Sequence, residues 1–282
     1  TAGPRASAAR QVEAAVAAVP GSVLHRYQLP ETRRQAVQIV VGRGKTETRV
    51  YVHPQMLTVL KTVNEDDWAN AWKAYFKPLK VSERLTIKPT WEDYTPANEK
   101  EKIIELDPGM AFGTGTHPTT ALCLRTLEKV IQGGEEVIDV GTGSGILAIG
   151  AVLLGAKHVL ALDLDPVAVS SARENSQLNG MLDHQITVKE SDLLSLLSGN
   201  QRDDLGVTLP VKVIVANILA EIILLFIDDV YRALEPGGVY IASGIYKNKE
   251  DVVQQALKDS GFEIEDVCRD EDWIAFVARK RS

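Results

Sequence analysis

This sequence has few cysteines and no long run of apolar residues. Its two cysteines, Cys123 and Cys268, lie far apart and outside any C-x-x-C pair, which argues against a disulfide framework and against a zinc knuckle. No apolar stretch approaches the roughly 20 residues of a membrane span, and the first residues lack the charged and then apolar pattern of a secretory signal. We therefore expect a cytoplasmic protein with no membrane partner.

Positive charge is also scarce. The chain has 31 lysines and arginines against 38 aspartates and glutamates, a net charge of −7, with a sequence pI of about 5.4. Proteins that bind nucleic acid usually carry a basic surface, so we expect no direct nucleic-acid contact. A basic protein suits this surface better as a partner.

The chain is long enough to bury a sizeable core. With 282 residues, 45% of them hydrophobic, it fits one large domain and one smaller domain. Residues 1–62 predict a small α+β domain, with a helix over 6–19 and strands over 21–27, 36–41 and 48–52. Residues 63–100 predict a linker helix and a loop, in which Trp68, Trp72 and Phe76 share one helix face. We expect that aromatic face to dock on a domain.

From residue 103 onward, short apolar runs alternate with helical patterns over 118–131, 146–154, 166–178, 220–234 and 249–260. This alternation predicts an α/β domain over 101–282, a Rossmann-like doubly wound sheet of seven strands with helices on both faces. The last two strands, near 262–267 and 273–277, are close enough in sequence to form a hairpin. We therefore expect one antiparallel strand at the sheet edge.

The most informative stretch is Val-Ile-Asp-Val-Gly-Thr-Gly-Ser-Gly at 137–145, followed by a second strand that ends at Asp163. Glycines let the backbone approach a ligand closely, and an acid at the tip of the next strand can accept two hydrogen bonds from a ribose diol. Asp165 and Pro166 fit the N-cap and the first position of the next helix. Asp163 is then left to face an adenosine-containing cofactor.

The identity of that cofactor depends on the sixth place of the glycine turn. Dinucleotide-binding turns require glycine there to seat a pyrophosphate, and this chain has Ile146. S-adenosylmethionine fits better, because its cationic sulfonium and amino-acid tail call for carboxylates and carbonyls. The residues expected around that tail are Asp139, Gly141, Gly143 and Gly145.

Two later strands end in polar residues at the same edge of the predicted sheet. Asp192, after Ser191, could reach the adenine, and an ordinary helix cap is an equally good explanation. Asn217 closes a strand of valines and isoleucines, where it would lie beside the methyl donor. The alternative for Asn217 is a simple cap on the next helix.

A second glycine-rich segment covers residues 107–120. It lacks the G-x-x-x-x-G-K-[ST] pattern, so it is not a phosphate loop. We expect a mobile lid in which Phe112 and Gly113 contact the cofactor and Thr120 offers a hydroxyl. His117 has no companion ligands nearby in sequence, which favours a hydrogen-bonding role, and we expect no metal site.

Taken together, segment 107–120, the 137–145 turn, Asp163-Leu-Asp-Pro, Ala-Asn217-Ile-Leu-Ala and Ser-Gly244 resemble the bacterial PrmA family of methyltransferases, which modify the eleventh protein of the large ribosomal subunit. The resemblance runs from about residue 63 to residue 278. It implies cofactor contacts by Thr120, Gly141, Asp163 and Asn217, methylated lysine and α-amino groups as products, and a small N-terminal substrate-recognition domain. Residues 1 to about 60 are shorter than the family pattern and differ from it in sequence.

Three other functions compete with this one. A methyltransferase of the same class could act on another protein or on RNA, although base-flipping enzymes carry an Asn-Pro-Pro-Tyr type loop where this chain has Asn217-Ile218-Leu219. A non-catalytic cofactor-binding assembly factor would not need Asn217. A nicotinamide dehydrogenase is disfavoured by Ile146. We expect the protein to act as a monomer on a large-subunit ribosomal protein.

Overall fold

The computed structural model describes residues 8–28, 37–43, 46–52, 59–64, 76–107, 117–192 and 205–282. The chain divides into two compact units, Thr1–Phe76 and Lys77–Ser282. This division differs from the expected domain limits at residues 62 and 101, because the strand at 85–89 pairs both with the strand at 79–80 and with the strand at 102–106. In the described part of the chain, no helix is both long and apolar enough to cross a membrane.

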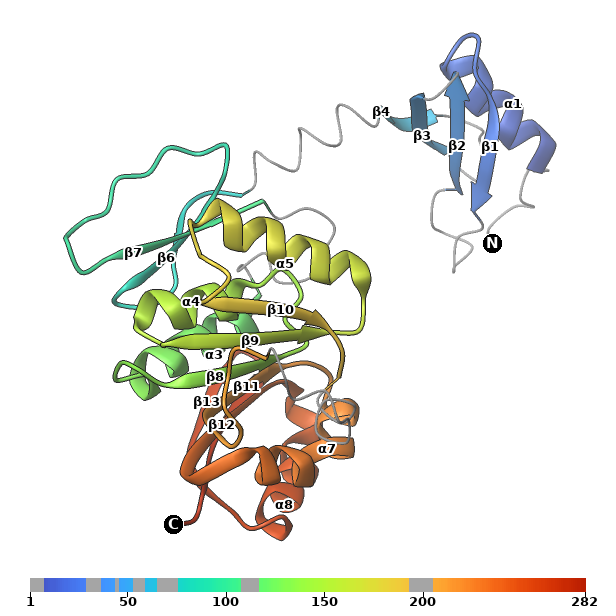
Figure 1. Ribbon diagram of the computed structural model, residues 1–282. Helices are drawn as coiled ribbons and strands as arrows, with labels where there is room; N and C mark the ends of the chain where they lie inside the picture. Colours follow the sequence, from blue (N-terminus) through green and yellow to red (C-terminus); the bar gives the residue numbers. More distant parts are fainter. Residues whose placement is uncertain are drawn as a thin grey trace. The chain divides into compact units, whose positions relative to one another are not determined.

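The smaller unit packs one helix on a four-stranded antiparallel sheet (Figure 1). Its elements are α1 (Ala8–Ala18), β1 (Val23–Gln28), β2 (Val37–Arg43), β3 (Thr46–Val52) and β4 (Val59–Asn64). Ala15 of α1 is fully buried against Ile39, Val41 and Val50 of the sheet. Strand β4 was not predicted, and it includes residues 63 and 64, which we expected to begin a helix. Trp68 and Trp72 lie outside the described residues.

The larger unit is built on a seven-stranded sheet in the order β10-β9-β8-β11-β12-β14-β13. Its strands are β8 (Glu136–Val140), β9 (His158–Asp163), β10 (Ile186–Glu190), β11 (Val211–Asn217), β12 (Leu234–Tyr246), β13 (Phe262–Asp270) and β14 (Trp273–Lys280). The first five strands of that order are parallel. The order reverses between β8 and β11, which confirms a Rossmann-like doubly wound sheet and places its switch point there.

The hairpin at the end of the chain corrects one expectation. Strand β14 is antiparallel to both of its neighbours, so the antiparallel strand lies one place inside the sheet and β13 forms the edge. The side chains explain this order. Ile274, Phe276 and Ala278 of β14 are buried, whereas β13 alternates acidic and apolar residues and keeps one buried residue, Phe262. An apolar strand gains more from two neighbours than an acidic one.

Helices cover both faces of the sheet (Figure 1). They are α3 (Pro118–Val130), α4 (Ile146–Leu154), α5 (Pro166–Leu178), α7 (Ala220–Ala233) and α8 (Glu250–Asp259), with a 3-10 turn, η2 (Lys247–Lys249). Alternate strand residues face opposite sides. Val137 of β8 therefore packs in the core formed with α3 and α4, and Ile138 packs in the core formed with α7 and α8.

A three-stranded sheet completes the larger unit. It consists of β5 (Leu79–Lys80), β6 (Leu85–Pro89) and β7 (Lys102–Leu106), in the order β5-β6-β7. Leu85, Ile104 and Leu106 join the core of α3 and α4. The chain between β6 and β7 is irregular, as predicted for residues 91–100, and is fixed by Glu101. This carboxylate, 4% exposed, accepts hydrogen bonds from Thr86, Tyr94 and the Ala97 N–H, which lower its pKa to about 2.

Candidate functional site

The glycine turn after β8 has the left-handed backbone that its sequence predicts. Gly141, Gly143 and Gly145 have φ values of 73°, 56° and 83°, a region that residues with a Cβ rarely adopt. The N–H groups of Gly141 and Thr142 donate to the Leu162 carbonyl at 2.8 and 2.9 Å. The turn is therefore fastened to the end of β9.

Asp163, at the end of β9, is held in place by two backbone donors. Its Oδ2 accepts from the Gly143 N–H at 2.9 Å, and its Oδ1 accepts from the Asp165 N–H at 3.0 Å. Each carboxylate oxygen can accept a second hydrogen bond. The side chain also lines a cavity, so it offers that cavity a fixed pair of acceptors suited to a diol.

Asn217, at the end of β11, presents a buried acceptor at the switch point. Its Nδ2 lies 3.4 Å from Thr120 Oγ1 on α3. Its Oδ1 is buried and finds no hydrogen-bond donor among the described residues. A buried amide oxygen without a partner is unfavourable by about 1–3 kcal/mol, which suits a site where a ligand N–H or a water supplies the missing donor.

Two glycines make room for the residue that follows Asn217. A Cβ at Gly141 would overlap Ile218 Cγ2, and a Cβ at Gly244, where φ is 85°, would overlap the Ile218 backbone. The Ile218 N–H also donates to the Ser243 carbonyl at 3.1 Å. Gly141 and Gly244 therefore serve the packing of this loop, and they fix the direction in which Asn217 leaves β11.

These strand ends surround one cavity of about 710 Å³, within the 300 to 1,000 Å³ typical of small-molecule sites. The predicted residues that line it are Gly141, Asp163, Asp192 and Asn217. Thr120, Asp139, Gly143 and Gly145 are not among the lining residues, and Phe112 and Gly113 lie outside the described residues.

Asp139 is not among the residues that line the cavity, and its carboxyl bonds a residue of the turn. It is fully buried, and its Oδ2 accepts from Thr142 Oγ1 at 2.6 Å. Burial raises the pKa of this carboxyl to about 7, against the opposing effect of the Thr142 hydrogen bond. Thr142 lies in the turn, so this carboxyl helps to fix the shape of the turn. The contact between Asp139 and the cofactor that the sequence predicts stays a prediction.

Sequence reasoning missed most of the apolar wall of the cavity. Leu219 and three residues of α7, Ile222, Leu225 and Phe226, line it, and Leu219 and Leu225 are 65% and 72% exposed. The run Ile222–Ile227 is apolar at every position, more than one buried helix face requires. These additional apolar residues were the feature of the sequence that could have predicted an apolar surface outside the core.

An aromatic pair forms another part of the wall. The ring of His117 meets the ring of Trp273 edge to face, with centroids 4.7 Å apart. His117 is also the N-cap of α3, and its side chain accepts from the Thr119 N–H at 3.3 Å. This is the hydrogen-bonding role expected for His117. The described residues contain no cluster of three side chains suited to a metal ion.

Comparison with known proteins identifies the family. The family model for ribosomal protein L11 methyltransferase (PrmA) matches residues 29–281. The chain belongs to this family. The PrmA resemblance drawn from the sequence is thereby confirmed, and the match extends into the smaller unit.

Individual PrmA relatives agree with that assignment. Proteins named ribosomal protein L11 methyltransferase from Bacillus cereus (strain AH820) and Bacillus anthracis are 55% identical over 217 residues. That region is 77% of this chain and 66% of each relative, slightly under two thirds of their length. The crystal structure of a ribosomal protein L11 methylase from Lactobacillus delbrueckii subsp. bulgaricus superposes with a TM-score of 0.66 at 38% identity, covering 73% of this chain and all of that one.

Proposed function

We propose that this protein is an S-adenosylmethionine-dependent N-methyltransferase that methylates lysine and α-amino groups of a large-subunit ribosomal protein. The observation that carries the proposal is the pairing of Asp163 and Asn217 on one cavity at the switch point of the sheet. One offers acceptors for a sugar diol, and the other offers an acceptor for an amine. Membership of the PrmA family and the names of the Bacillus relatives support it.

The residues around the cavity fit S-adenosylmethionine. Asp163 would hold the ribose, the carbonyl groups of the turn at 141–145 would meet the amino-acid tail, and Ser191 and Asp192 after β10 would meet the adenine. Ile146 occupies the place that a dinucleotide-binding turn reserves for glycine. When bound, this cofactor supplies a methyl group on a positively charged sulfur.

Asn217 and the apolar wall would prepare the acceptor amine. A lysine with a pKa of about 10.4 must lose its proton first, which costs about 4 to 5 kcal/mol at pH 7. The apolar side chains of Leu219, Ile222 and Leu225 disfavour an ammonium ion and so lower that pKa. We infer that the proton leaves to solvent, and that Asn217 Oδ1 accepts a hydrogen bond from the neutral amine and aims its lone pair.

The choice of a ribosomal protein as substrate rests on the family and on charge. A chain with a net charge of −7 would attract a basic protein more readily than RNA. We infer that the smaller unit recognises the substrate and that the larger unit carries the methyl-transfer site.

The test is methyl transfer from labelled S-adenosylmethionine to a pool of bacterial ribosomal proteins, followed by mass spectrometry. We expect label in one large-subunit protein, on lysine and α-amino nitrogens. Label in ribosomal RNA would favour the RNA alternative. Cofactor binding by calorimetry with no transfer to either pool would favour a non-catalytic assembly factor, and the absence of binding would overturn the proposal.

A further inference from the structure

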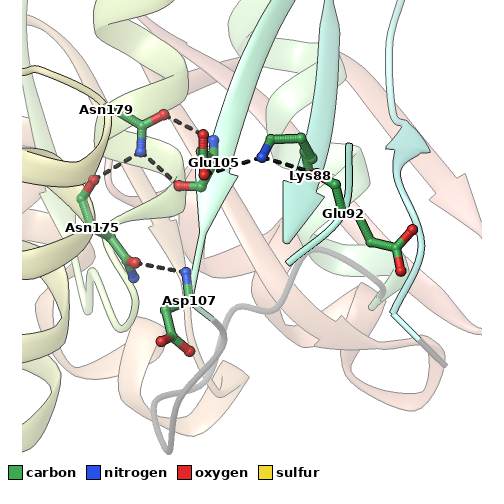
Figure 2. Close-up of polar contacts among 6 residues, drawn as sticks. All are labelled: Lys88, Glu92, Glu105, Asp107, Asn175 and Asn179. Carbon is green, nitrogen blue, oxygen red and sulfur yellow. Dashed lines mark hydrogen bonds and ion pairs between the residues drawn. The ribbon is translucent and has the colours of Figure 1, made fainter. Parts of the chain in front are cut away.

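Asn175 on α5 and Asn179, the C-cap of that helix, bond the backbone of β7 and of Asp107, the residue that follows β7 (Figure 2). Asn179 Oδ1 accepts from the Glu105 N–H at 2.9 Å, and its Nδ2 donates to the Glu105 carbonyl at 2.6 Å. Asn175 Oδ1 accepts from the Asp107 N–H at 3.0 Å. Since β7 is the edge of its sheet, these side-chain amides take the place of a neighbouring strand.

The spacing of the contacts follows from the geometry of the two elements. Four residues of an α-helix advance about 6 Å, and two residues of a strand advance about 6.6 Å. Two asparagines four residues apart, one in α5 and one at its C-cap, therefore meet backbone groups two residues apart, at Glu105 in β7 and at Asp107 just after it. Because residues two apart in a strand point their N–H groups the same way, both groups face α5.

Asn175 makes one contact that Asn179 does not share. Its Nδ2 donates to the Ser144 carbonyl, in the middle of the glycine turn, at 2.9 Å. The side chain is 2% exposed. Next to it, a Cβ at Gly145 would come 3.1 Å from Ala172 Cα, so α5 is packed directly on the turn. One amide group thus joins the turn at 141–145 to Asp107, the first residue of the glycine-rich segment 107–120.

That segment returns to the site at its other end. His117 and Thr119 line the cavity, and Thr120 contacts Asn217. An asparagine is suited to this position because its side-chain amide can accept one hydrogen bond and donate another. An aspartate in its place could accept from the Asp107 N–H and could not donate to the Ser144 carbonyl.

We propose that Asn175 is a positioning residue: it fixes the start of segment 107–120 relative to the glycine turn, so that cofactor binding at the turn is coupled to the backbone at Asp107. The inference rests on the proposed function. Asn179 holds β7 against α5 without reaching the turn, which makes it the matched control.

The first experiment compares cofactor affinity by calorimetry in the unaltered protein and in the variants Asn175→Asp, Asn175→Ala and Asn179→Ala. We expect Asn175→Asp and Asn175→Ala to bind S-adenosylmethionine about tenfold more weakly, equivalent to about 1.4 kcal/mol. We expect Asn179→Ala to bind within about twofold of the parent, with a lower melting temperature. Equal affinity for the parent and Asn175→Asp would overturn the proposal.

The second experiment needs no variant, so it decides the matter even if the substitutions prevent folding. Amide exchange measured by NMR should slow at Asp107 by at least about fivefold when S-adenosylmethionine is added, and by less at Glu105. An Asp107 rate that does not change while the cofactor binds would overturn the coupling. Absence of binding to the unaltered protein would instead overturn the proposed function.

Discussion

The protonation of Asp139 makes the stability of the fold depend on pH. Its folded-state pKa of about 7 lies above the value of about 3.9 expected in the unfolded chain. Between those values the folded protein holds a proton that the unfolded chain releases, so this residue's contribution to stability falls as pH rises from about 4 to 7.

We therefore predict that Asp139→Asn raises the free energy of unfolding at pH 8 relative to the parent, by an amount on the order of a few kcal/mol. The asparagine oxygen can still accept from Thr142 Oγ1, so the turn is kept. Urea unfolding of both proteins at pH 5 and pH 8 measures the difference, which should be smaller at pH 5. A difference that does not change with pH would show that Asp139 is ionised in the folded state throughout.

We expect Asp163 to act mainly in cofactor binding and Asn217 to act mainly in turnover. Asp163 meets the cofactor in the ground state, so Asp163→Ala should weaken cofactor affinity by about tenfold or more, by loss of charge-assisted hydrogen bonds. Asn217 orients the reacting amine, so Asn217→Ala should lower kcat by more than it weakens cofactor affinity. Calorimetry and steady-state rates separate the two effects, and equal losses of affinity and turnover in both variants would contradict this division.

At the residue scale, the sequence predicted the side chains at the strand ends better than the other residues that line the cavity. It was predictable that Asp163 and Asn217 would line one cavity, because the carboxyl ends of parallel strands meet at the same edge of a sheet. The hydrogen bond between Asp139 and Thr142 was not foreseen, because nothing local in the sequence reveals that contact. Leu225 was not foreseen in the wall, because an exposed leucine differs from a buried one only through the surrounding fold.

At the scale of elements, α5 links the site to the rest of the larger unit. Its start is fixed by Asp165, whose side chain accepts from the Val167 N–H at 2.9 Å, with Pro166 in the first turn. This confirms the cap expected from the sequence. The backbone N–H of Asp165 also donates to Asp163. Asp165 therefore caps α5 with its side chain and holds Asp163 with its backbone.

We predict that Asp165→Ala lowers the free energy of unfolding by about 1 kcal/mol, through loss of the N-cap. Cofactor affinity should change by less than about threefold, since alanine keeps the N–H that Asp163 uses. Asp165→Asn, which caps equally well, is the control and should match the parent in both measurements. Thermal unfolding and calorimetry on the three proteins provide the check. A large loss of affinity in both variants would mean that the side chain itself meets the ligand.

Elements with strong local signals were the predictable ones. Helices α4 and α5 were foreseen to the residue, and β9 ends at Asp163 as expected, because glycine, proline and apolar runs mark their limits. Strands β5 and β6 were missed because a two-residue strand and Leu-Thr-Ile-Lys-Pro carry little pattern. The place of β14 inside the sheet depends on competition between two strands for one neighbour, which no single segment reveals.

At the scale of the whole molecule, the two units differ in how much they bury. The larger unit has two extensive cores on opposite faces of its sheet, whereas the described core of the smaller unit has four fully buried members, Ala15, Ile39, Val41 and Val50. All described residues that line the cavity lie in the larger unit. Cofactor binding and substrate recognition should therefore be separable.

We predict that a fragment of residues 77–282 folds and binds S-adenosylmethionine within about threefold of the full chain, because its cavity and cores are retained. Its kcat/KM on the ribosomal protein should fall by at least about tenfold, since the unit inferred to hold the substrate is gone. A short peptide carrying the lysine proposed as the methyl acceptor is the control, because it is too small to use the smaller unit and should be methylated equally by both proteins. If the fragment methylated the intact ribosomal protein as fast as the full chain does, recognition would lie in the larger unit, beside the apolar wall formed by Leu219, Ile222 and Leu225.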